Sequence, residues 1–151
     1  MYWLMKSEPT TFSILDLKSK PQSRDQWEGV RNYEARNYLK AMKQDELAFF
    51  YHSNCTVPGI VGIMKVTRTA WPDRTAFDPS SAYFDPQSIS ENPRWYCVEV
   101  ELISSFSKII SLQQLRRLSS LSRMRLLQKG SRLSVMPVRE AEWEMILSLA
   151  A

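Results

Sequence analysis

Three short stretches in the first third of the chain concentrate side chains suited to recognising a flat ligand. They are residues 6–9, 27–33 and 51–54, which together supply a tryptophan, amides, an arginine, a histidine and hydroxyls. A flat heteroaromatic ligand needs an aromatic wall for stacking, worth roughly 1–3 kcal/mol per base, and a few directional groups for its edge. The three stretches therefore predict a pocket for a heteroaromatic group at the place where they meet.

Each of these residues, taken singly, also fits an ordinary structural role. Trp27 fits a core aromatic, Asn32 a helix cap, Arg31 the partner of a nearby glutamate, and His52 a hydrogen-bonded histidine at a strand end. It is their grouping at three neighbouring strand or helix ends that favours a pocket.

Other kinds of chemistry lack the residues they need. The single histidine, His52, is followed directly by Ser53, and adjacent residues of a strand point to opposite faces, so a serine-hydrolase triad is not expected. Nothing near Cys55 marks a lowered thiol pKa. With four glycines there is no phosphate-cradling loop, and two cysteines with one histidine cannot form a four-ligand zinc site. We expect no cofactor and no metal.

The positive charge gathers in the last third of the chain. The net charge is only +4, but residues 103–139 contain eight lysines and arginines and no acid. Such asymmetry suggests an anionic partner, nucleic acid above all, although a solvated face with its acids elsewhere in space would look the same. The phosphate-binding candidates are Arg116, Arg117, Arg123, Arg125, Lys129 and Arg132.

The elements that must position these residues indicate an α+β domain with a mixed or curved sheet. The chain has 151 residues, 44% of them apolar, which predicts one domain over residues 1–151. Two cysteines, no signal peptide and no membrane span indicate a cytoplasmic protein. Pattern and propensity predict strands at 2–6, 46–52, 60–70 and 94–103, helices at 13–17, 32–42, 111–127 with a break near 119–120, and 139–149, and a long ordered loop at 71–94.

Eight motifs resemble those of the EVE domain family in order along almost the whole chain. They are residues 5–9 (MKSEP), 27–37 (WEGVRNYEARN), 50–54 (FYHSN), 58–62 (PGIVG), 76–79 (AFDP), 83–86 (YFDP), 93–95 (PRW) and 132–135 (RLSV). The resemblance implies a PUA-like fold, a curved mixed sheet or pseudo-barrel flanked by helices. It also implies a non-catalytic module that binds DNA or RNA carrying a methylated or hydroxymethylated base, or the free modified nucleobase or nucleoside.

Carried over residue by residue, the resemblance implies an aromatic-walled pocket for the modified base. Its expected lining is Lys6, Ser7, Glu8, Trp27, Val30, Arg31, Asn32, His52 and Ser53, with Phe77 and Asp78 from the long loop and Trp95 as a weaker candidate. Two positions depart from the family pattern: Gln44 stands where a helix-ending glycine is usual, and Arg139 where a capping threonine is usual.

Two other functions fit the same residues. ASCH relatives include small amidohydrolases that act on modified nucleosides with Lys, hydroxyl and Glu side chains, the types found at Lys6, Ser7 and Glu8. The aromatic loop 71–84 would instead suit a protein-interaction module. The pattern leaves open DNA versus RNA, the modification read, and the oligomeric state.

Overall fold

The computed structural model describes residues 1–150 and has a six-stranded mixed sheet at its centre. The strands are β1 (Tyr2–Ser7), β2 (Arg24–Trp27), β3 (Leu47–His52), β4 (Gly59–Pro72), β5 (Tyr96–Ser111) and β6 (Val135–Val138), in the order β2-β5-β4-β3-β1-β6. The α-helices are α1 (Ile14–Ser19), α2 (Tyr33–Ala41), α3 (Leu112–Arg116) and α4 (Glu140–Leu149). None of the described helices is long and apolar enough to span a membrane.

Two long strands, β4 and β5, curve the sheet. Their antiparallel pairing shifts register at four places, and β3 against β4 at one more. Such bulges bend a strand and increase its twist. As a result Trp27, on the edge strand β2, reaches Phe50 on β3, with ring centroids 5.2 Å apart, although two strands lie between them in the sheet order. The sheet curls like a barrel but leaves a seam between β2 on one side and β1 with β6 on the other.

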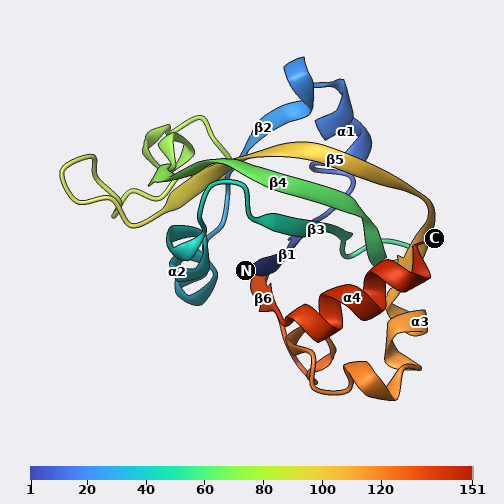
Figure 1. Cartoon of the computed structure of the whole chain (residues 1–151). Coiled ribbons are helices and arrows are strands. Elements are labelled where there is room, and N and C mark those ends of the chain that lie inside the picture. Colours follow the sequence, from blue (N-terminus) through green and yellow to red (C-terminus); the bar gives the residue numbers. More distant parts are fainter. Residues whose placement is uncertain (151) are drawn as a thin grey trace.

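Strand β3 is buried on both faces because neighbouring residues point in opposite directions. Phe49 stacks on Trp143 of α4 at a centroid distance of 3.9 Å, whereas Phe50 faces Phe12 and Trp27 inside the curl. Figure 1 shows α4 and α3 together at one end of the molecule, with α1 and β2 at the other. The core therefore has one layer on each face of the sheet. Only the layer inside the curl, which contains Phe50, Phe12 and Trp27, borders the seam.

The two departures from the family pattern are accommodated locally. The residue with a left-handed conformation after α2 is Asp45, at φ 72°, and its N–H donates to the Val66 carbonyl over 2.7 Å. At the start of α4, the Arg139 side chain offers no acceptor, but the Arg139 N–H donates to Glu142 Oε1 over 2.9 Å. Half of a capping box is thus retained.

Four elements differ from the sequence expectation. The four-residue strands β2 and β6 are absent from the predicted set, and β5 continues to Ser111 instead of ending at residue 103. The helix predicted over 111–127 is wrong beyond its first turn, since α3 is followed by separate 3₁₀ turns at Ser119–Leu121 and Arg125–Leu127. Its apolar residues recur every three positions, from Leu115 through Leu118 and Leu121 to Met124 and Leu127, which suits three residues per turn and not 3.6.

Candidate functional site

A cavity of about 440 Å³ opens at the seam between β1 and β2. This volume lies in the usual range for small-molecule sites. The lining comes from the end of β1 and the loop after it, from β2 and the turn that follows, from the long loop, and from the residue before β6. The lining residues are Lys6, Ser7, Glu8, Thr11, Phe12, Lys20, Asp25, Gln26, Trp27, Glu28, Gly29, Val30, Arg31, Tyr83 and Ser134.

Six of the expected pocket residues lie in this lining, and five do not. The six are Lys6, Ser7, Glu8, Trp27, Val30 and Arg31. The five outside it are Asn32, His52, Ser53, Phe77 and Asp78, and the weaker candidate Trp95 is also outside. Sequence reasoning missed Phe12, Asp25, Glu28 and Tyr83, although Glu28 stands inside the motif 27–37 and Tyr83 opens the motif 83–86.

Trp27 forms the aromatic floor of the cavity. Only 5% of its surface is exposed, and its ring meets Phe12 and Phe50 nearly edge-on, at centroid distances of 6.1 and 5.2 Å. Perpendicular aromatic packing of this kind is favourable and fixes the plane of the indole. Trp27 is therefore both a core residue and a cavity residue, which joins the two roles that the sequence left open.

Tyr83 forms an aromatic wall that depends on a glycine. Gly29 has φ +85°, and a Cβ added there would lie 2.6 Å from the Tyr83 ring. No side chain fits in that space, and the backbone conformation itself favours glycine. The Gly in the motif 27–37 thus allows a loop more than 50 residues away in sequence to close against β2.

The buried carboxylate of Asp73 holds the long loop against the turn after β2. It is fully buried, and its Oδ2 accepts hydrogen bonds from the Gly29 N–H (2.8 Å) and from Arg31 Nη1 (3.1 Å). Its Oδ1 accepts from the backbone and hydroxyl of Thr75. Arg31 also donates to the Tyr83 carbonyl through Nε and Nη2. The Arg31 guanidinium is thereby committed to positioning Tyr83.

The loop between β1 and α1 is anchored by side chains at the strand ends. Ser7 Oγ donates to the Phe12 carbonyl over 2.7 Å, and the Ile14 N–H donates to His52 Nε2 over 3.1 Å. The Ser53 N–H donates to the Ser7 carbonyl, and Asn54 Nδ2 donates to Glu8 Oε1. Burial lowers the pKa of His52, which keeps the acceptor nitrogen unprotonated. These groups fix the loop that presents Phe12 to the cavity.

The remaining expected residues serve other parts of the fold. Asn32 Oδ1 accepts from the Ala35 N–H over 2.9 Å and caps α2. Phe77 and Asp78 line a separate cavity of about 540 Å³, together with Trp71 and other residues of the long loop. Trp95 donates from Nε1 to Asp85 Oδ2 over 2.7 Å. It also stacks on Tyr33, with ring centroids 4.9 Å apart.

Two ionisable groups of the cavity are perturbed by their surroundings. Burial lowers the pKa of Lys6, and burial together with the Asp73 and Asp25 carboxylates raises the pKa of Glu28. Residues 1–150 hold no group of three or more His, Cys, Asp or Glu side chains placed to bind a metal ion. The cavity is thus a polar and aromatic chamber with both basic and acidic groups in its walls.

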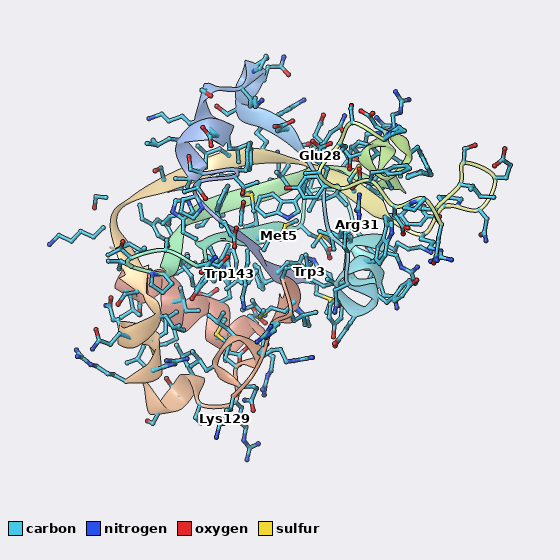
Figure 2. All side chains as sticks on the ribbon, turned by 180° about the vertical axis from the view of Figure 1, so that it is seen from behind. Trp3, Met5, Glu28, Arg31, Lys129 and Trp143 are labelled. Atoms are coloured by element: carbon cyan, nitrogen blue, oxygen red, sulfur yellow. The ribbon has the colours of Figure 1, made fainter. Side chains whose placement is uncertain are left out.

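The basic segment, residues 103–139, is spread over the end of the molecule that carries α3 and α4. Figure 2 places Lys129 at the opposite end from Glu28. Arg125 binds both carboxylate oxygens of Glu34 over 2.9 and 3.0 Å. Arg132 lies two residues before Ser134, which lines the cavity and whose carbonyl accepts from the Lys6 N–H. Of the six phosphate-binding candidates, Arg132 is therefore the nearest in sequence to a residue of the cavity lining. Arg125 is already paired with Glu34.

The curved, open mixed sheet and its flanking helices place the chain in the PUA-like α+β class, which confirms the fold expected from the sequence. Within that class, the EVE domain model matches residues 1–149, and the chain belongs to the EVE domain family. Thymocyte nuclear protein 1 of Mus musculus is 44% identical over 165 residues, which cover 98% of this chain and 73% of the mouse protein.

Two solved structures are similar over nearly the whole chain. A crystal structure of a protein from Pseudomonas syringae has a TM-score of 0.96 and 46% identity, with all of both chains covered. The human THYN1 protein in complex with 5-methylcytosine-containing DNA has a TM-score of 0.94 and 42% identity, covering 99% of this chain and 96% of the human one. The human relative thus binds DNA that carries a methylated base.

Removal of the Asp73 carboxylate tests the clamp on the long loop. Asp73→Ala leaves the Arg31 charge and the Gly29 N–H without their partner, and we expect it to lower the free energy of unfolding by about 3–5 kcal/mol. Urea denaturation measures this change. Glu144→Ala, an exposed substitution on α4, serves as the control and is expected to stay within about 0.5 kcal/mol of the wild type. Equal stability of the two variants would contradict the clamp.

The lowered pKa of His52 predicts how the stability of the protein depends on pH. Because the folded-state pKa lies below the ordinary histidine value of 6.5, the unfolded chain binds the extra proton first. The His52 contribution to stability is complete above about pH 6.5 and is lost as the pH falls toward the folded pKa. NMR titration of this histidine, the only one in the chain, should give a midpoint below 6.5. A midpoint at or above 6.5 would exclude the neutral acceptor.

Proposed function

We propose that this protein binds DNA carrying a methylated base and takes that base into the cavity between β1 and β2. The observation that carries the proposal is the aromatic floor of Trp27, set within a cavity of about 440 Å³ whose walls are polar and aromatic. The human THYN1 protein, which binds 5-methylcytosine-containing DNA, shares the fold over almost the whole chain and supports the same class of ligand.

Unstacking the target base from its neighbours costs a few kcal/mol. Stacking on an aromatic side chain returns roughly 1–3 kcal/mol, and hydrogen bonds to the base edge supply the remainder. Trp27, held in place by Phe12 and Phe50, offers a surface of fixed orientation, and Tyr83 closes the side next to Gly29. Since these rings are already ordered, little conformational entropy is lost when the base enters.

The phosphates are held outside the cavity by the basic segment. Its exposed cations include Arg116, Arg117, Arg123, Lys129 and Arg132. In the cavity, by contrast, the carboxylates of Glu8, Asp25 and Glu28 are matched in number by Lys6, Lys20 and Arg31. Exposed cations attract the backbone without reading sequence, whereas the aromatic and hydrogen-bonding groups of the cavity suit a base. Affinity for DNA is then expected to depend on the salt concentration. Selectivity for the modified base is expected to be independent of it.

Substitution of the aromatic floor is the direct test. Trp27→Ala is expected to weaken binding of a 5-methylcytosine oligonucleotide at least about tenfold, because the stacking surface is removed. Fluorescence anisotropy measures the dissociation constant. The same oligonucleotide in unmodified and in hydroxymethylated form, and an RNA oligonucleotide, are measured for comparison. Because Trp27 is also buried, its removal destabilises the fold as well. Tyr83→Ala, on the long loop, is therefore the second variant.

Trp71→Ala is the matched control, since Trp71 is an aromatic residue that lines the separate cavity. It is expected to bind as the wild type does. Wild-type affinity in a folded Trp27→Ala and in Tyr83→Ala would show that the base does not enter this cavity.

Neutralising the basic segment separates the grip on the phosphates from the reading of the base. In the triple variant Arg116→Gln, Arg117→Gln, Arg132→Gln we expect weaker binding of modified and unmodified DNA alike. The slope of log affinity against log salt should become shallower by about 0.9 for each phosphate that the variant no longer neutralises. The ratio of the two affinities should not change. A slope equal to that of the wild type would exclude these residues as phosphate ligands.

A further inference from the structure

The polar side chains of the cavity divide into those with partners inside the protein and those without. Ser7 donates to a carbonyl, Glu8 accepts from Asn54, and the Arg31 guanidinium donates to the long loop and to the Val30 carbonyl. Asp25 accepts from the Gln26 N–H over 2.8 Å and lies 3.6 Å from Lys20 Nζ. These side chains hold the walls of the cavity, so the groups that read a ligand must be sought among the others.

Glu28 is a carboxylate of the cavity that no hydrogen bond satisfies within the described residues. Its pKa is raised by burial first, and then by the charges of Asp73 and Asp25, with Lys20 and Arg31 opposing them. No hydrogen bond is among these causes. The side chain nevertheless remains accessible to solvent, and hence to a ligand. It is thus an acceptor in the cavity lining that lacks a donor among the described residues.

A hydrogen-bond donor on the base distinguishes 5-methylcytosine from thymine, which has almost the same shape. 5-Methylcytosine carries an amino group at position 4, where thymine carries a carbonyl oxygen, and the two share the ring and the methyl group. A carboxylate accepts a hydrogen bond from the amino group of cytosine, as Glu and Asp do in protein–DNA complexes. The same carboxylate cannot form a hydrogen bond with the thymine oxygen, because both groups are acceptors and their lone pairs repel each other.

We propose that Glu28 is a specificity-determining residue that accepts a hydrogen bond from the exocyclic amino group of a cytosine-type base and so rejects thymine and uracil. This inference rests on the proposed function, because it names the class of base that the same cavity takes. Trp27 ends β2 and Glu28 follows it, and both residues line the cavity, so one cavity holds the residue proposed to stack on the base and the residue proposed to read its edge.

Lys6 complements Glu28 from the opposite wall. It lines the cavity from β1, whereas Glu28 lines it from the turn after β2, and burial alone perturbs its pKa. An ammonium group is a donor only, and cytosine offers acceptors at N3 and O2 beside its amino group. Thymine instead presents an N–H at position 3. Gln26, which also lines the cavity, carries both a donor and an acceptor and therefore does not discriminate between the two bases.

The test compares two single-stranded oligonucleotides that differ only in 5-methylcytosine or thymine at one position. Single strands remove the unequal cost of opening a base pair. The wild-type protein is expected to prefer 5-methylcytosine by about 5- to 150-fold. In Glu28→Gln that preference should fall to near one, because an amide can turn either its oxygen or its nitrogen toward the base.

Glu144→Gln is the matched control, because it removes the same charge from α4, at the other end of the molecule. Both variants should bind DNA slightly more tightly through their lower negative charge, but only Glu28→Gln should lose the preference. An unchanged ratio in Glu28→Gln, or a wild-type protein that binds both oligonucleotides equally, would overturn the role of Glu28 while modified-base binding stands. A wild-type protein that does not distinguish 5-methylcytosine from unmodified cytosine would overturn the proposed function itself.

Discussion

The contact between Trp27 and Phe50 is the constraint on which the site depends. It joins an edge strand of the sheet to a strand three places away, and it exists because β4 and β5 are long and irregular enough to curl. Without that curl, β2 and β1 would lie far apart across a flat sheet. With it, their ends face each other across a seam, and the cavity forms there without a dedicated subdomain.

Polar residues near the cavity perform two separate tasks. Ser7, Arg31 and His52 bond to backbone or to buried groups, and they hold the loops that carry Phe12 and Tyr83. Within residues 1–150, the side chains of Glu28 and Lys6 have no such bonds, and burial is the largest cause of their pKa shifts. A site built in this way is preorganised by one set of residues and reads its ligand with another, so changes in the first set alter the fold before they alter selectivity.

The sequence predicted what local pattern determines. Alternating and apolar runs located β1, β3 and β4, and helical periodicity with a cap at Asn32 located α2. It could not predict β2 and β6, whose four residues are defined by pairing with distant strands. Nor could it identify Asp73 as the partner of Gly29 and Arg31, since more than 40 residues separate them and nothing local marks a buried carboxylate. Tyr83 was missed for the same reason.

The distribution of charge gives the site its direction. The chain is basic overall, at +4, yet Glu8, Asp25 and Glu28 all line the cavity. Lys6, Lys20 and Arg31 line it as well, so the charged side chains of the cavity balance, whereas residues 103–139 carry eight cations and no acid and attract the phosphodiester groups. Within the cavity, a neutral base that carries an amino group can donate to the Glu28 carboxylate, which has no hydrogen-bond donor among the described residues. In the proposed function, the basic segment therefore attracts the backbone, while the aromatic floor and the acceptor within the seam favour entry of the base.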